Sequence, residues 1–261
     1  MARRKRVNVR LLLLLIGLGT VGIIALIPYE LSMFDLRPLP PEAGNLTPTV
    51  IVSINTLSKI FMLIVFVFLG ERMLRRTNLD VPYFHAWVHK QPMPRFSIKW
   101  LYVAIGVSLF ISLVMIGLDH FLFLPQINIP LHTDQTMSWW HGLFAMFYGG
   151  ITEELMVRFF GMTFIVWLLS VIMRRQRETI PKFVYMIAII GAALLFGLSH
   201  LPATEQLFGQ LTPLIILRAL VLNGLPGIWF GYLYYRKGLE YAMIAHLTAD
   251  FFLHVLFVPL F

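Results

Sequence analysis

The sequence predicts an all-α fold: a polytopic transmembrane helix bundle of about seven spans, with its N-terminus in the cytoplasm. Three observations lead to this fold class. Hydrophobic residues make up 58% of the 261 residues and charged residues only 13%, whereas soluble proteins average about 25% charged. The mean hydropathy is +0.78. The apolar residues form long segments, and the basic residues gather in the connections between them.

Each predicted span is long enough to cross a bilayer, which takes roughly 17–25 predominantly apolar residues. The spans are expected near residues 11–27, 50–69, 101–124, 139–172, 184–200, 212–235 and 240–260. The first follows a basic N-terminus, as in a signal peptide, but no small-residue cleavage site follows it, so we expect a retained helix. The chain has no cysteine, which excludes a disulfide framework, a thiol nucleophile and a thiolate metal site.

Positive charge is concentrated on one side of the predicted membrane. Of the 21 Lys and Arg residues, 17 lie in the N-terminus, the 70–99 connection, the connection after the fourth span or the turn before the seventh. Arg37 lies on the opposite side, and Lys59, Arg158 and Arg218 lie within spans. Because cytoplasmic loops carry an excess of Lys and Arg, the net charge of +8 sets the orientation and does not indicate a nucleic-acid partner.

The fourth span is longer than a bilayer requires. An unbroken helix from Trp139 to Leu169 would reach about 45 Å, against a hydrocarbon core of about 30 Å. Gly149 and Gly150 can break this helix, and Thr152 can then cap a new one. The alternative is one long tilted helix that projects from the membrane, and the sequence favours neither.

Two adjacent acidic residues, Glu153 and Glu154, interrupt this apolar span. Each costs roughly 2.5–3.5 kcal/mol on insertion scales, so we expect them to be functional or neutralised by a partner. Glu154 and Arg158 are four residues apart on one helix face and can form an ion pair. Glu153 lies about 100° round the helix and has no such partner.

Two other apolar segments carry polar groups of the same kind. His200 follows Phe196 by one turn, and His246 and Asp250 share a face of the seventh span. A glutamate in a water-poor cavity can act as a general base, and a histidine can donate a hydrogen bond to an oxyanion. Glu153 with the two histidines therefore suffices for amide hydrolysis by an activated water. The alternative is structural, with histidines that only bond neighbouring helices and Phe196 as an ordinary packing residue.

These motifs, in this order, resemble the hallmark of the CPBP family, the CAAX proteases and bacteriocin-processing enzymes, also called Abi or type II CAAX endopeptidases. They are Glu-Glu-x-x-x-Arg at Glu153, Glu154 and Arg158, Phe-x-x-x-His at Phe196 and His200, and His-x-x-x-Asn/Asp at His246 and Asp250. The resemblance covers residues 139–256 and implies intramembrane proteolysis. By this resemblance Glu153 is the general base, and His200 helps it to activate water. His246 and Asp250 form the oxyanion side, supported by Glu154 and Arg158.

Position 250 departs from the usual pattern, because prenyl-protein proteases of this family usually carry Asn there. An amide offers an N–H donor to an oxyanion, whereas ionised Asp250 offers none. Asp250 must therefore be protonated, orient His246 or bind a metal. The resemblance favours a mechanism without a cofactor. The alternative is Zn²⁺ held by Glu153, His200, His246 and Asp250, because two histidines with a carboxylate form a known catalytic set.

We expect N-terminal transmembrane helices and a cytoplasmic connection over residues 1–138, and a catalytic core over residues 139–261. The expected activity is cleavage, within the lipid bilayer, of a membrane-embedded or lipidated peptide or protein. The expected location is a membrane, the plasma membrane in a prokaryote. A non-enzymatic immunity or scaffold protein of the same fold is the alternative from another class. A proton-coupled carrier is favoured less, because its acids would lie in repeat-related broken helices.

Helical rise places the two histidines at different distances from the cytoplasmic ends of their helices. His246 lies about 14 Å along its helix from the preceding turn, whereas His200 lies about 27 Å from Lys182. The two histidines meet only if the fifth helix begins well outside the bilayer, or if either helix is tilted or displaced.

Overall fold

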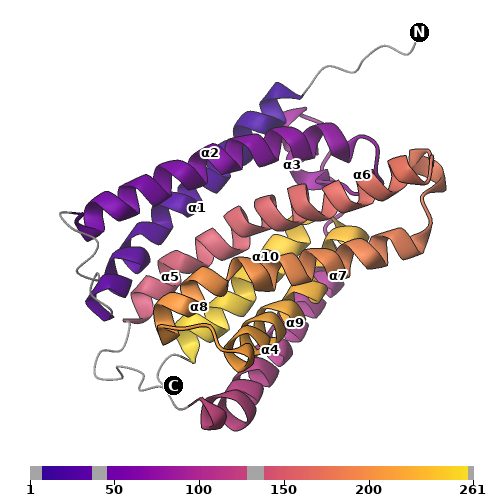
Figure 1. Ribbon diagram of the computed structural model, residues 1–261. Coiled ribbons are helices and arrows are strands. Elements are labelled where there is room, and N and C mark those ends of the chain that lie inside the picture. The colour runs from indigo at the N-terminus through magenta and orange to yellow at the C-terminus, as the bar shows by residue number, and fades with distance from the viewer. Residues whose placement is uncertain (1–7, 37–45, 128–137, 258–261) are drawn as a thin grey trace.

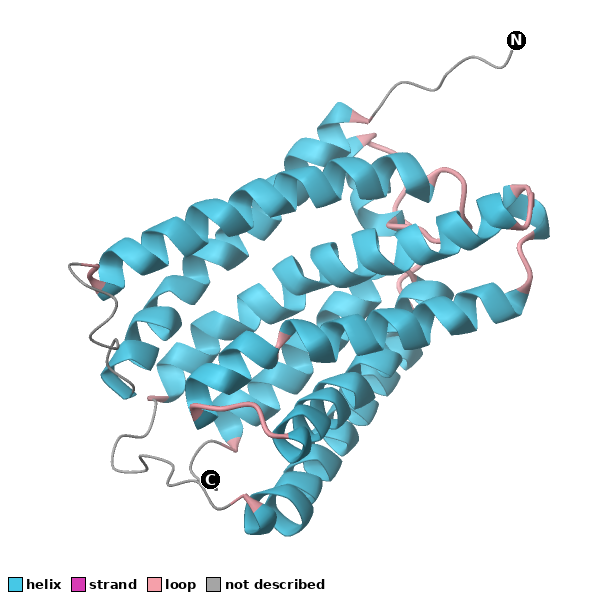
Figure 2. Cartoon of the chain, viewed as in Figure 1, coloured by secondary structure: helices cyan, strands magenta, loops and turns pink. Residues whose placement is uncertain are grey.

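The computed structural model describes residues 8–36, 46–127 and 138–257. Within these ranges every regular element is helical, and the helices pack into a bundle (Figures 1 and 2). The predicted all-α fold class is therefore confirmed. Arg37, which the charge pattern places on the outer side, lies outside the described residues.

Long helices form most of the bundle: α1 (Val9–Leu36), α2 (Pro48–Leu74), α4 (Ile98–Leu118), α7 (Lys182–Ser199), α9 (Pro213–Lys237) and α10 (Leu239–Phe251). The fourth predicted span consists of α5 (Trp139–Phe147), the π-helical η4 (Tyr148–Met162) and α6 (Thr163–Ile172). Short π-helical segments, η2 (Asp119–Phe123) and η6 (Phe252–Leu256), extend α4 and α10. The connections contain α3 (Pro82–Val88), α8 (Leu201–Phe208) and the 3₁₀ turns η3 (Leu124–Gln126) and η5 (Arg177–Thr179).

Six helical stretches in the described part of the chain are long and apolar enough to cross a membrane. They are Val9–Phe34, Pro48–Leu74, Ile98–Gln126, Trp139–Ile172, Lys182–Phe208 and Pro213–Lys237, and they match the first six predicted spans. The predicted seventh span corresponds to α10 with η6, which is not among these six. The chain is a multi-pass membrane protein, while the seventh crossing and the cytoplasmic N-terminus stay predictions.

Local sequence signals explain where several helices begin and end. Thr47 and Thr212 each accept, on their side-chain oxygen, a hydrogen bond of 3.3 Å from the backbone N–H three residues later. Pro48 and Pro213 then occupy the first helical positions, where a missing N–H has no cost. Helix α9 ends before Gly238, whose φ of 100° is a conformation that glycine adopts without strain.

The fourth predicted span is one continuous helix of 34 residues, Trp139–Ile172. The alternative with a helix break is therefore wrong, and so is a capping role for Thr152. Its hydroxyl donates instead to the carbonyl oxygen of Gly19 in α1, at 2.8 Å. The middle of the long helix is π-helical. This conformation is rare in proteins, and where it occurs it is often at a functional site.

Gly149 and Gly150, which could have broken this helix, instead allow a close approach to α10. A Cβ atom at Gly149 would collide with the carboxylate of Asp250, and one at Gly150 would collide with the side chain of Leu247. Glycine is needed at these positions because the backbone of η4 lies directly against side chains of α10. The pair therefore determines how closely two of the motif-bearing helices approach.

Helices from both halves of the sequence build the core. Helices α1 and α2 lie side by side (Figure 1) and both contact η4, while α10 packs against α4, α9 and η4. The buried apolar cluster joins Leu15 and Leu63 of the N-terminal half to Leu155, Phe159 and Ala242. The predicted domain boundary at residue 138 stays a prediction. Helix α1, from before that boundary, packs directly on α5 and η4, which follow it.

Two charged residues predicted to lie within spans have partners on neighbouring elements. Lys59 of α2 forms an ion pair with Glu30 of α1. Arg218 of α9 donates two hydrogen bonds to the carboxylate of Asp119, at 2.6 and 2.5 Å. Pairing of this kind lowers the cost of placing charge among apolar helices.

Candidate active site

The six predicted site residues come from three elements that meet inside the bundle. Segment η4 carries Glu153, Glu154 and Arg158, and α10 carries His246 and Asp250, while His200 directly follows α7. Segment η4 contacts both α7 and α10. Residues that are up to 97 positions apart in the sequence therefore form one cluster of side chains.

Glu154 and Arg158 form a fully buried ion pair, as their spacing predicts. Arg158 Nη1 lies 3.0 Å from Glu154 Oε1, and both side chains are 0% exposed. Arg158 Nη2 also donates to the carbonyl oxygen of Gly227 at 3.2 Å. The guanidinium lies 4.5 Å from the ring centre of Phe196 and 5.2 Å from that of Phe230. These contacts hold the pair in one position and separate it from solvent.

His246 is held by Glu154. Its Nδ1 atom lies 2.8 Å from Glu154 Oε1, a hydrogen-bond distance. The other ring nitrogen, Nε2, lies 3.8 Å from Glu153 Oε2 and 3.6 Å from Asp250 Oδ1. Asp250 is thus close to His246, as the spacing predicts, but at a distance too long for a direct hydrogen bond. The residue that orients the ring is therefore Glu154 rather than Asp250.

His200 is oriented by the backbone of its own helix. The carbonyl oxygen of Phe196 lies 2.8 Å from His200 Nδ1. A carbonyl oxygen only accepts hydrogen bonds, so Nδ1 carries the proton in this contact. His200 Nε2 then points toward Glu153, with 3.9 Å between it and Oε1. Both histidines therefore present Nε2 to the same carboxylate.

Glu153 stands between the two histidines, and each of its oxygens faces one imidazole. The structure thus brings His200 and His246 to the same carboxylate. A start of the fifth helix outside the bilayer, its tilt and its displacement all stay predictions.

Aromatic rings enclose the imidazoles. The ring centre of Phe196 lies 4.6 Å from that of His200 and 5.5 Å from that of His246, and both contacts are edge-on. Phe230 stacks on His246 with 4.4 Å between centres. Phe196, expected to be an ordinary packing residue, touches both imidazoles as well as the guanidinium of Arg158. It helps to fix the relative positions of three polar side chains.

Side-chain exposure divides the cluster into two groups. Glu153 is 18% exposed and His200 28%, whereas His246 is 4% exposed. Glu154 and Arg158 are 0% exposed. Glu153 and His200 are thus the members most open to a substrate, and His246 presents its Nε2 atom toward Glu153. The buried pair can act only through the residues that it holds.

Two residues near the site, Phe230 and Tyr148, were not predicted from the sequence. Phe230 belongs to the sixth span, which carries none of the motifs. Tyr148 precedes Glu153 by five residues, and because π-helical bonds join residues five apart, the two share a face of η4. Lys59, paired with Glu30, has its Nζ 5.9 Å from the centre of the Tyr148 ring. That Tyr148 and Glu153 share a face could not be predicted, because no hydrophobic pattern in the sequence indicates a π-helix.

The donor types of the cluster are ones that Zn²⁺ accepts. Among the described residues, no group of three His, Asp or Glu side chains is arranged to hold a metal ion as it stands. The Nδ1 atoms of both histidines are bonded, one to Glu154 and one to the carbonyl of Phe196, which leaves both Nε2 atoms facing Glu153. Metal-binding histidines have the same kind of partner on the other ring nitrogen, so these contacts do not separate the two mechanisms, and the Zn²⁺ alternative stays a prediction.

The fold and the site together define the class of this protein. It is a multi-pass helical membrane protein with a largely buried cluster of acidic residues and histidines. The family model for type II CAAX prenyl endopeptidases, Rce1-like, matches residues 135–252. The matched region carries all three motifs and confirms the predicted resemblance to the CPBP family of membrane proteases. The comparisons with curated proteins and with solved structures gave no match.

Proposed function

We propose that the chain is an intramembrane endopeptidase that cleaves a peptide bond of a lipidated or membrane-embedded substrate, using a water molecule activated by Glu153 and histidine. One observation carries the proposal: the Glu153 carboxylate lies between two imidazole Nε2 atoms, at 3.9 Å from His200 and 3.8 Å from His246. Both distances are too long for a direct hydrogen bond and suit a bridging water.

The histidine tautomers support this assignment. His200 uses its Nδ1–H for the carbonyl of Phe196, so its neutral Nε2 can accept a hydrogen bond from the water. A water placed between Glu153 and His200 then has two acceptors for its two hydrogens. In this orientation an oxygen lone pair of the water points away from both acceptors and can attack the carbonyl carbon of a bound peptide.

In the proposed reaction, Glu153 takes a proton from the water, and the oxygen attacks the carbonyl carbon to form a tetrahedral intermediate. His246, protonated on both nitrogens and paired through Nδ1 with Glu154, donates Nε2–H to the negative oxygen. One such donor contributes about 3–4 kcal/mol where it has been measured. Glu153 then passes its proton to the leaving amine as the C–N bond breaks.

The Zn²⁺ alternative predicts a different response to chelation. A reaction that depends on Glu153 and the histidines alone keeps its rate when the purified protein is treated with a strong chelator. Loss of activity that added Zn²⁺ restores would overturn the metal-free proposal and favour a metal-assisted hydrolysis.

The experiment that tests the activity uses purified protein in lipid vesicles with a mixed library of prenylated CAAX peptides and unmodified transmembrane peptides. Mass spectrometry identifies the new termini produced by the wild type and by Glu153→Gln. The matched control is Glu178→Gln, the same chemical change at an exposed position in η5. We expect cleavage by the wild type and the control, and none by Glu153→Gln.

The same experiment separates the proposal from a non-enzymatic immunity or scaffold protein. Such a protein would bind peptides without cutting them, and Glu153→Gln would leave its biological effect intact. If neither the wild type nor the control produces new termini from any peptide class, while both retain peptides on the protein, the binding alternative is favoured.

A further inference from the structure

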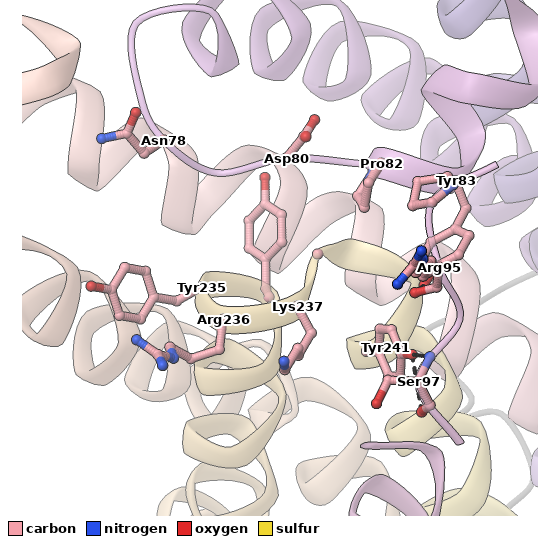
Figure 3. A pocket seen from close by; sticks show the side chains of 13 residues that line it. Asn78, Asp80, Pro82, Tyr83, Arg95, Ser97, Tyr235, Arg236, Lys237 and Tyr241 are labelled. Atoms are coloured by element: carbon pink, nitrogen blue, oxygen red, sulfur yellow. Dashed lines mark hydrogen bonds between the residues drawn. The ribbon is translucent and has the colours of Figure 1, made fainter. Parts of the chain in front are cut away.

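A polar cavity of about 330 Å³ lies away from the candidate active site, at the end of the bundle where α9 turns into α10 (Figure 3). Its walls come from the α2–α3 connection, the segment before α4, and the two helices of the turn. The lining residues used below are Asp80, Arg95, Ser97, Arg236, Lys237 and Tyr241. None of the six site residues contributes to it.

The cavity carries an excess of positive charge. Arg95, Arg236 and Lys237 line it, and Asp80 is the acidic residue among the lining side chains. Asp80 Oδ1 accepts a hydrogen bond from the backbone N–H of Val81 at 2.8 Å, so part of its charge is already satisfied. The ion pairs recorded among the described residues include none of the three cations. Their charge is therefore available for an anion.

The beginning of α4 adds to this positive character. Ser97, the residue before α4, bonds through its N–H to the Tyr241 hydroxyl at 2.9 Å, which anchors this helix start at the cavity. The N-terminus of a helix as long as α4 carries a partial positive charge. Lys237 Nζ lies 4.2 Å from the ring centre of Trp100, one turn into the same helix. Tyrosine and tryptophan at such positions are typical of the membrane–water boundary.

We propose that this cavity binds the phosphate group of an anionic phospholipid. It lies at the end of the bundle that the basic residues predict to be cytoplasmic, where the leaflet is negatively charged. Basic cavities between transmembrane helices on that side are suited to lipid headgroups. The proposal concerns a site apart from the candidate active site and does not depend on the protease activity.

A lipid fits better than a free phosphate ion because the cavity adjoins an exposed apolar helix face. Ile98 and Tyr102, in the first two turns of α4, are exposed large side chains next to the cavity wall at Ser97. Acyl chains attached to a phosphate in the cavity can lie along this face of α4 within the bilayer. A free phosphate ion gains nothing from it.

The test is a lipid titration of the purified full-length protein in neutral detergent, followed by native mass spectrometry. Phosphatidylglycerol is compared with phosphatidylcholine, and the wild type with the double variant Arg236→Gln and Lys237→Gln. We expect the wild type to prefer phosphatidylglycerol at least about tenfold. The double variant lacks two basic residues that attract an anionic lipid. We therefore expect it to bind phosphatidylglycerol about thirtyfold more weakly than the wild type does.

The matched control removes two positive charges elsewhere on the same side. Arg174→Gln with Arg175→Gln alters exposed residues after α6, outside the cavity. We expect this variant to bind phosphatidylglycerol within about twofold of the wild type. An equal loss in both double variants would show charge attraction without a site and would overturn the proposal. Inorganic phosphate that displaces the lipid at a similar concentration would also overturn it, in favour of a free-anion site.

Discussion

His246 Nδ1 lies 2.8 Å from Glu154 Oε1, and that same oxygen lies 3.0 Å from Arg158 Nη1. One buried carboxylate therefore connects the first motif to the third. It balances the charge of Arg158 and selects which nitrogen of His246 faces the accessible side of the cluster. The residue next to the proposed base is thus a positioning residue, and its effect on catalysis passes through the imidazole.

Glu154→Gln tests this positioning role. The amide retains an oxygen that can accept from His246 Nδ1, but it loses the charge that stabilises a protonated ring. We expect kcat to fall about 10- to 100-fold, the range seen for residues that hold metal-binding histidines in place, while KM changes little. Steady-state kinetics in vesicles measure kcat and KM separately. A rise in KM with kcat unchanged would assign Glu154 to substrate binding instead.

Arg158→Met should destabilise the fold. The change breaks a fully buried ion pair and leaves His246 as the remaining partner of Glu154, and removal of one partner of a buried pair costs about 3–5 kcal/mol. Thermal unfolding in detergent should show a clear loss. The double variant Arg158→Met with Glu154→Gln should recover part of it, because the buried carboxylate charge is gone. No recovery in the double variant would indicate that packing on Phe196 and Phe230 matters more than charge.

Gly149→Ala should impair activity through a close contact. The added Cβ would collide with the Asp250 carboxylate and lie 3.2 Å from His246 Nε2. We expect a loss of cleavage rate with the protein still folded in the membrane. Gly224→Ala is the matched control, because nothing lies within 4 Å of the Cβ it would add. Equal rates in both variants would show that η4 and α10 separate easily.

Asp250→Asn should be tolerated. Asp250 lies 3.6 Å from His246 Nε2 and makes no direct hydrogen bond to it, so an amide can occupy the same space. We expect the cleavage rate to stay within about tenfold of the wild type, because neither the proposed base nor the Glu154–His246 contact changes. A complete loss that excess Zn²⁺ reverses would point to a metal ligand at this position.

Much of the site follows from helical spacing in the sequence. The Glu154–Arg158 pair forms because residues four apart share a helix face, and the structure brings the three motifs together. The contact between Glu154 and His246 could not be predicted, because it depends on how η4 and α10 pack against each other. Spacing within one helix contains no information on that relationship.

The same limit explains why the sequence favoured neither a broken nor a continuous fourth span at Thr152 and the two glycines. Their residue types suit a helix break, but in the structure they make contacts between helices: Thr152 with α1, and the glycines with α10. The partners of Lys59 and Arg218 are likewise on other elements. Local propensity was overridden by packing, which stabilises most helices in folded proteins.

The most direct test of the central claim is the cleavage rate of Glu153→Gln beside chelator-treated wild type, in the same vesicles and with the same peptide. A general base contributes about 10²–10⁴-fold to a rate. We predict that Glu153→Gln loses at least about a hundredfold, while the chelated wild type keeps its full rate. A Glu153→Gln rate within a few-fold of the wild type would contradict the assignment of Glu153 as the group that activates water.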